Sequence, residues 1–115
     1  ATIPLVHKVS ELYKDLYRLG NIVPKRDRFG IFMKIEVTVL DILEGVLTAS
    51  FEERNNKEGV LKKVRIKTEI LKRLIRIVYN LNIIPSKKYI GVEGQLQEIS
   101  MMINGWIKYV SKKGG

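Results

Sequence analysis

Hydrophobic residues recur at spacings of three and four along most of the chain, the period of a helix with one buried face. The first stripe consists of Leu5, Val9, Leu12, Leu16 and Leu19. Pro4 suits a first helical turn, and Gly20 favours helix termination. The pattern predicts a first helix over about residues 4–20.

A second segment, about residues 28–52, has two hydrophobic stripes side by side. One stripe consists of Phe32, Ile35, Val39, Ile42, Val46 and Ala49, and the other of Met33, Leu40, Leu43, Leu47 and Phe51. A single neighbouring surface cannot cover both stripes. We therefore expect this helix to lie at the centre of the fold or at a subunit interface.

Two further helices are predicted, over about residues 56–81 and 86–111, with Asn56 and Ser86 as their N-caps. The third helix has the stripe Val60, Val64, Leu71, Ile75 and Val78. The fourth has Tyr89, Val92, Leu96, Ile99, Ile103, Trp106 and Val110, which keep a heptad spacing. The sequence contains no β-type alternation. We therefore predict an all-α fold, an antiparallel up-down four-helix bundle forming a single domain over residues 1–115.

Positive charge is concentrated in the third helix. Lys57 to Arg76 contains eight Lys or Arg residues against two Glu residues, which accounts for six of the nine net positive charges of the chain. A cationic stripe on a rigid helix suits a polyanion, because binding releases the counterions of its phosphates. The alternative is a solvated face held by internal ion pairs, since Glu58 is four residues before Lys62 and Glu69 is four from both Arg65 and Arg73. The candidate nucleic-acid-binding residues are Lys62, Lys63, Arg65, Lys72, Arg73, Arg76, Lys25, Arg26, Arg28, Lys112 and Lys113.

The second and third helices carry more hydrophobic surface than one small bundle can bury. We expect these residues to form a homo-oligomer interface: Leu40, Leu43, Leu47, Phe51, Ile66, Ile70 and Ile77.

Residues for catalysis are scarce. The only histidine is His7, for which we expect a structural role, and no glycine-rich phosphate loop with a lysine is present. Asp41 and Glu44 could ligate Mg²⁺, but a buried ion pair with Lys67 is the favoured interpretation. A small enzyme using these three residues is a minor alternative. For Trp106 we expect core packing, with base stacking as the alternative. We therefore predict a non-enzyme with no metal and no cofactor.

The absence of cysteine and of any long hydrophobic run favours the reducing cytoplasm, with no membrane partner. At a pI near 9.9, nucleic acid is the expected partner.

The motifs also resemble a known family. The junction Val23–Gly30 (Val-Pro-Lys-Arg-Asp-Arg-Phe-Gly) and the triplet Leu43–Gly45 (Leu-Glu-Gly) are similar to motifs of the four-helix-bundle proteins first found in intervening sequences of 23S ribosomal RNA genes. Arg65–Leu71 and Ile99–Lys108, with its Gly-Trp pair, resemble the Avd branch, the accessory variability determinant of diversity-generating retroelements. The chain departs from the pattern at Ser100–Asn104, where members often have Gly-Arg-Met-Leu-Gly.

The resemblance implies a pentameric barrel of four-helix bundles with a basic surface. Such a protein would bind RNA or DNA and partner a reverse transcriptase that copies a template RNA into adenine-mutated cDNA. The alternative is an intervening-sequence-type protein that acts as an RNA-binding or protein-interaction scaffold.

Overall fold

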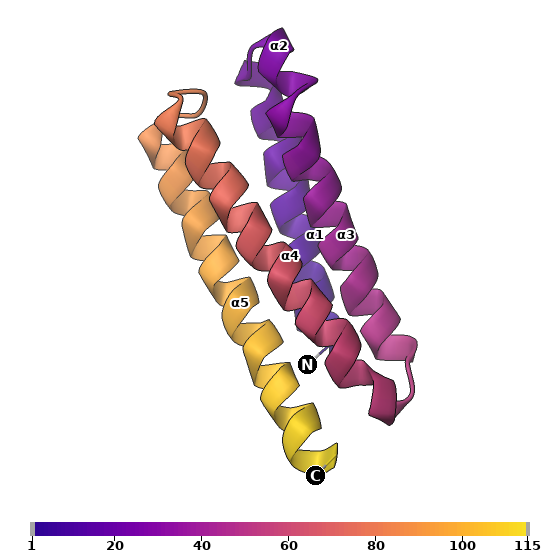
Figure 1. Cartoon of the computed structure of the whole chain (residues 1–115). Coiled ribbons are helices and arrows are strands. Elements are labelled where there is room, and N and C mark those ends of the chain that lie inside the picture. The colour runs from indigo at the N-terminus through magenta and orange to yellow at the C-terminus, as the bar shows by residue number, and fades with distance from the viewer. Residues whose placement is uncertain (1, 115) are drawn as a thin grey trace.

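Four long helices run up and down in antiparallel order (Figure 1). The computed structural model describes the backbone of residues 2–114 and the side chains of residues 3–112. The long helices are α1 (Thr2–Leu19), α3 (Ile31–Phe51), α4 (Arg54–Asn80) and α5 (Ser86–Gly114). A 3₁₀ turn, η1 (Gly20–Ile22), and the single-turn helix α2 (Lys25–Arg28) connect α1 to α3. The all-α prediction is confirmed over the described residues, which contain no strand.

The helices pack in the ring α1–α3–α4–α5, with α1 and α5 closing it. The bundle is elongated, with extents of 48 × 22 × 20 Å. Because α3 lies between α1 and α4, one of its two hydrophobic stripes faces the core and the other faces outward. The sequence indicated that one neighbouring surface could not cover both stripes of this helix. In the monomer the second stripe is indeed largely exposed.

The predicted core stripes of α1 and α3 are confirmed, because all of their residues are buried. On α4 the stripe needs one correction: Leu61 is buried, whereas Val60 is only partly so. Thr68 is also buried, and its hydroxyl donates a hydrogen bond to the Val64 carbonyl (2.9 Å). Residues seven apart on a straight helix drift by about 20° per heptad, so the buried face shifts along it. For the same reason the last turns of α5 bury Ile107, and Trp106 is left partly exposed.

Helix α3 begins at Ile31 instead of about residue 28, and the predicted N-caps of α4 and α5 are both wrong. Helix α4 begins at Arg54, and its N-cap is Glu53, whose side chain makes no capping hydrogen bond. Asn56 is therefore not the cap. Ser86 is the first residue of α5 instead of its cap. Before it, Asn82 adopts a left-handed conformation (φ 61°) and turns the chain from α4 into α5.

Gly45 of α3 packs directly against α4. A methyl group at this position would collide with Cγ2 of Val64, a buried, β-branched side chain with little rotamer freedom. Gly94 and Gly105 of α5 do not mark a close helix approach, because an added methyl at either would meet no atom within 4 Å apart from its chain neighbours. Within the described chain that role belongs to Gly45.

We expect Gly45→Ala to destabilise the bundle by about 1–3 kcal/mol, because the gain in helix propensity is outweighed by overpacking against Val64. Urea unfolding followed by circular dichroism measures this. The matched control is Gly94→Ala, which should stabilise the protein by about 0.5–1 kcal/mol. In a Val64→Ala background the collision is removed, so Gly45→Ala should lower the free energy of unfolding by less than it does in the wild-type protein. Equal stabilisation by Gly45→Ala and Gly94→Ala would contradict the close approach.

Candidate nucleic-acid interface

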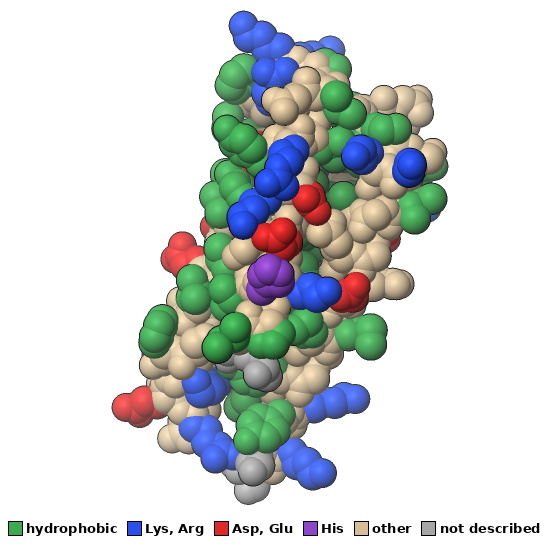
Figure 2. Space-filling model, turned by 180° about the vertical axis from the view of Figure 1, so that it is seen from behind, with side chains coloured by type: hydrophobic (Ala, Val, Ile, Leu, Met, Phe, Trp, Pro, Cys, Tyr) green, Lys and Arg blue, Asp and Glu red, His purple; other side chains and the backbone are tan. Residues whose placement is uncertain are grey.

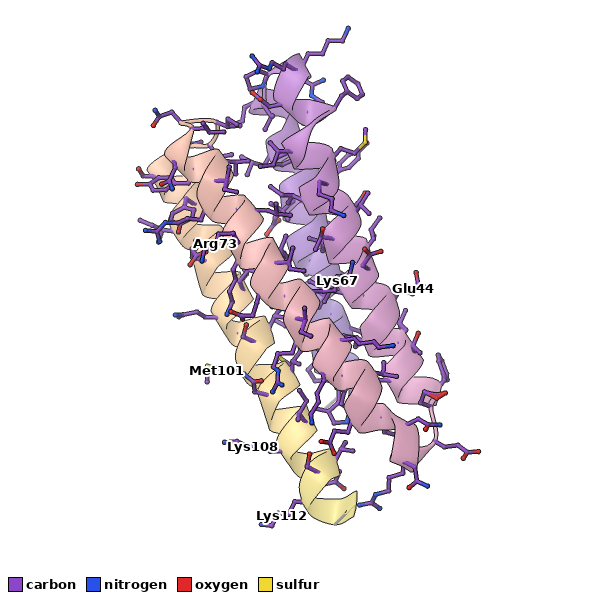
Figure 3. The ribbon with its side chains drawn as sticks, viewed as in Figure 1. Glu44, Lys67, Arg73, Met101, Lys108 and Lys112 are labelled. Atoms are coloured by element: carbon purple, nitrogen blue, oxygen red, sulfur yellow. The ribbon has the colours of Figure 1, made fainter. Side chains whose placement is uncertain are left out.

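A groove between α4 and α5 contains most of the predicted basic residues of α4. Its central part, about 620 Å³, is lined by Arg65 and Arg73 from α4 and by Ser100 and Asn104 from α5. The remaining lining is Ile66, Thr68, Glu69, Ile70 and Ile103. Figure 3 shows Arg73 on the side of α4 next to α5. The groove therefore combines guanidinium groups with a partly hydrophobic floor.

The groove continues toward the α4–α5 turn in a second hollow of about 450 Å³. Arg76, Lys72, Tyr89 and Glu93 are among its lining residues. Between Arg65 and Arg76 the helix rises ~16 Å. That length can accommodate several phosphates of one nucleic-acid strand.

Ion pairing divides the predicted cations of α4 into two groups, and Lys62 of the first group does not line the groove. Lys62 pairs with Glu58 (2.9 Å) and Lys72 pairs with Glu69 (3.0 Å). Arg65 and Arg73 form no ion pair with any described residue. Within the described part of the chain, Arg76 donates a single long hydrogen bond, from Nη1 to the Tyr89 hydroxyl (3.4 Å). The internal-pair interpretation therefore holds for only part of this helix. Some of its cations are internally compensated, and three arginines keep their charge available.

The pKa of the Glu58 carboxyl reflects its internal pair with Lys62. Hydrogen bonds from the Lys62 ammonium and the Ser111 hydroxyl lower the pKa of Glu58 below its ordinary value. The carboxylate thus stays ionised at neutral pH and compensates Lys62. Lys62 is consequently a weaker candidate for phosphate binding than Arg65 or Arg73.

The outer edge of α5 adds Lys108, a cation that the sequence analysis did not assign, one turn before the predicted Lys112. Lys108 and Lys112 point away from the bundle on the same side as Met101 (Figure 3). Their spacing of four along a helix could have revealed the pair. Lys112 was predicted and is exposed, whereas the side chain of Lys113 lies outside the described residues.

The remaining predicted cations lie apart from this groove. Lys63 is exposed on α4 but does not line it. Lys25 and Arg26 are exposed on α2, at the end of the bundle that also holds the α4–α5 turn (Figure 1). Arg28 donates a hydrogen bond from Nη2 to the Val23 carbonyl (3.1 Å), which supports the local turn.

The predicted buried triad of Asp41, Glu44 and Lys67 is wrong in two respects. Lys67 Nζ does pair with Asp41 Oδ2 across α4 and α3 (3.2 Å), but the two side chains are 42% and 39% exposed. Glu44 is exposed and points away from Lys67 (Figure 3). Three residues after Asp41, Glu44 is turned outward by about 60°, beyond the reach of α4. A surface pair of this kind contributes little stability.

The described residues contain no group of three or more His, Cys, Asp or Glu side chains placed to hold a metal ion. His7, the only histidine, is exposed on α1. Among the described helices, none combines the length and hydrophobicity that a membrane crossing requires.

Exposed hydrophobic residues form a stripe along the outer face of α3. It consists of Met33, Val37, Leu40, Leu47 and Phe51. Leu43, which we had placed in the interface, packs partly buried against the core and does not belong to this stripe. On α4 the predicted Ile66, Ile70 and Ile77 are all exposed.

Fold and surface together define a class of protein, a basic four-helix bundle with a cationic groove between its last two helices. A comparison with protein families matches residues 4–110 to the bAvd-like family. Because the match covers nearly the whole chain, this chain belongs to the bAvd-like family, and the Avd-type resemblance inferred from its motifs is confirmed. No curated protein matches the sequence.

Proposed function

We propose that this chain is a non-catalytic, nucleic-acid-binding accessory protein of a diversity-generating retroelement. In this role it partners a reverse transcriptase during mutagenic cDNA synthesis from a template RNA. The observation that carries nucleic-acid binding is the α4–α5 groove, where Arg65 and Arg73 have no acidic partner among the described residues. The retroelement and its polymerase are inferred from membership of the bAvd-like family.

The contacts would be to phosphates and thus largely independent of base sequence. Fluorescence anisotropy of a labelled RNA strand across a salt series tests this directly. We expect reversible binding whose logarithm falls linearly with the logarithm of the salt concentration. A polyglutamate chain at equal salt is the comparison, since preference for it over RNA would support an acidic protein partner instead.

The polymerase partnership needs its own test. We expect the gene neighbourhood to encode a reverse transcriptase, and co-expression with that enzyme, followed by pull-down after nuclease treatment, should recover a complex. A gene neighbourhood without a reverse transcriptase and without template and variable repeats would favour the scaffold alternative.

We further propose that the chain forms a homo-oligomer, as a pentameric Avd-type barrel would require. The support is the exposed stripe of α3, together with the exposed isoleucines of α4. Ile66 and Ile70 also line the groove, so a second copy seated there would share this surface with nucleic acid.

We expect Leu40→Glu to weaken self-association about 30-fold per interface, because a leucine side chain loses about 2 kcal/mol of burial. Light scattering over a concentration series measures the assembly. Ile90→Glu is the matched control, since Ile90 is an exposed hydrophobic residue of α5 outside both stripes. The proposed α3 interface would be contradicted if the wild-type protein stayed monomeric. It would also be contradicted if Leu40→Glu and Ile90→Glu weakened self-association equally.

A further inference from the structure

A hollow of about 750 Å³ lies on the opposite side of α5 from the α4–α5 groove. Residues of three helices line it. Helix α1 contributes Pro4, and α4 contributes Arg54 and Lys57. Helix α5 contributes the remaining lining, Met102, Gly105, Trp106, Tyr109 and Val110. Its volume lies within the range of small-molecule sites in proteins.

The α5 wall of this hollow is aromatic. Trp106 packs against the core on one side while its ring lines the hollow on the other, and Tyr109 follows one turn later with 59% of its surface exposed. The indole N–H makes no hydrogen bond to any described residue. Gly105 also lines the hollow and adds no side chain to it, and a methyl there would meet no atom within 4 Å apart from its chain neighbours. The part of the Trp106 ring that lines the hollow is therefore the surface on which a planar group could stack.

The α4 wall is cationic. Lys57 is held in place by hydrogen bonds from its ammonium to the carbonyls of Ala49 (2.7 Å) and Ser50 (3.2 Å). These carbonyls lie in the last turn of α3 and compensate the lysine charge only in part, and they use two of the three N–H donors of the ammonium. Arg54 is exposed and forms no ion pair among the described residues. At the lower end of the rear view in Figure 2, hydrophobic side chains lie among those of Lys and Arg.

An aromatic wall facing a cationic wall matches a planar group that carries an anion. A nucleotide has this chemistry, with a base that stacks and a phosphate that pairs with Arg or Lys. The outer edge of α5, with Lys108 and Lys112, lies between the hollow and the α4–α5 groove (Figure 3). One strand could thus follow positive charge from the groove to the hollow.

We propose that the hollow binds an unpaired base of a single-stranded nucleic acid, stacked on Trp106 with its phosphate at Arg54 and Lys57. This inference rests on the proposed nucleic-acid binding and deepens it. Phosphate contacts in the groove accept single strands and duplexes alike, whereas a base held in a duplex cannot enter the hollow. The hollow therefore gives the protein a preference for single strands.

Trp106 is the only tryptophan of the chain, so its fluorescence reports this contact directly. The probes are oligouridylate and oligothymidylate of about 12 nucleotides, an abasic strand of that length, and a matching duplex. Anisotropy measures binding and intrinsic emission measures stacking. We expect both single strands to quench the emission. The duplex and the abasic strand should bind through their phosphates without quenching.

Variants separate stacking from charge. Trp106→Leu should weaken single-strand binding about tenfold and leave duplex binding unchanged, while Trp106→Phe restores part of the affinity. Gly105→Met keeps the tryptophan but fills the hollow, and should reduce both the quenching and the single-strand affinity. The matched control is Tyr17→Leu, which removes an aromatic ring 64% exposed on α1 and should change neither.

The outcomes distinguish this inference from the function on which it rests. If single strands bind without quenching, and Trp106→Leu and Gly105→Met bind like wild type, the hollow is not a base site but nucleic-acid binding stands. Equal quenching by duplex and single strand would also overturn the base site. If no nucleic acid binds at any salt concentration, the proposed function fails together with it.

Discussion

Replacing Arg65, Arg73 and Arg76 together by Gln is expected to lower the affinity for single-stranded RNA about 100-fold at ~0.1 M salt. Each phosphate contact to a single strand contributes about 0.7 to the slope of log K against log salt, so losing three contacts should flatten the slope by about 2. These three arginines line the groove and have no acidic partner among the described residues. Anisotropy titrations at several salt concentrations measure both quantities, with folding checked by circular dichroism.

The control must remove the same charge elsewhere. Lys8, Lys14 and Arg18 lie on α1, and each pairs with an acid: Glu98, Glu11 and Asp15 respectively. Their triple replacement by Gln leaves the net charge equal to that of the groove variant. We expect its salt slope to stay close to wild type and its affinity to fall by no more than about threefold. Equal losses in the two triple variants would mean that overall charge, and not the groove, binds nucleic acid.

Phe32→Ala is expected to destabilise the bundle by about 3–5 kcal/mol, a large part of the stability of a domain of this size. Phe32 is 1% exposed, and its ring packs against Gly20 at the end of α1. Removing the ring leaves a cavity where α1 meets α3, and the bundle cannot collapse into it without moving a whole helix. Urea unfolding at equilibrium measures the loss, which should appear as a lower midpoint with an unchanged m-value.

Phe29→Ala is the matched control for this substitution. Phe29 is three residues away and 61% exposed, so its replacement should change the free energy of unfolding by about 0.5 kcal/mol or less. A small effect of Phe32→Ala, or equal effects of the two variants, would contradict the packing of α3 described here.

Much of the site was visible in the sequence because charge density is a property of the chain itself. The cations of α4 were assigned from their spacing, and all but Lys63 lie along the groove or its internal pairs. What the spacing left open was which of them were compensated. Glu69 is four residues from both Arg65 and Arg73, yet it pairs with Lys72, which is three residues away. Which of these cations pairs with Glu69 depends on side-chain rotamers and on the packing of the neighbouring helix, and helical spacing gives neither.

The prediction of a buried ion pair among Asp41, Glu44 and Lys67 was wrong because it also depended on contacts between helices. Helical spacing placed Asp41, Glu44 and Lys67 near the contact of α3 with α4, but it could not give the rotation of one helix relative to the other. The observed rotation brings Asp41 to Lys67 at the surface and leaves Glu44 in solvent. The same rotation places Leu43 against the core and exposes Met33 and Val37.

The sequence by itself determined the helices, the buried stripes of α1 and α3, and the concentration of charge on α4, because each depends on residue types and their order along one chain. Only the tertiary structure decided which side chains from different helices meet. It joined α4 and α5 into one groove, brought Val64 against Gly45, and placed Trp106 opposite Arg54 and Lys57 in a single hollow. These contacts depend on helix rotation and axial shift, which are set by the packing of the whole core and not by any local pattern.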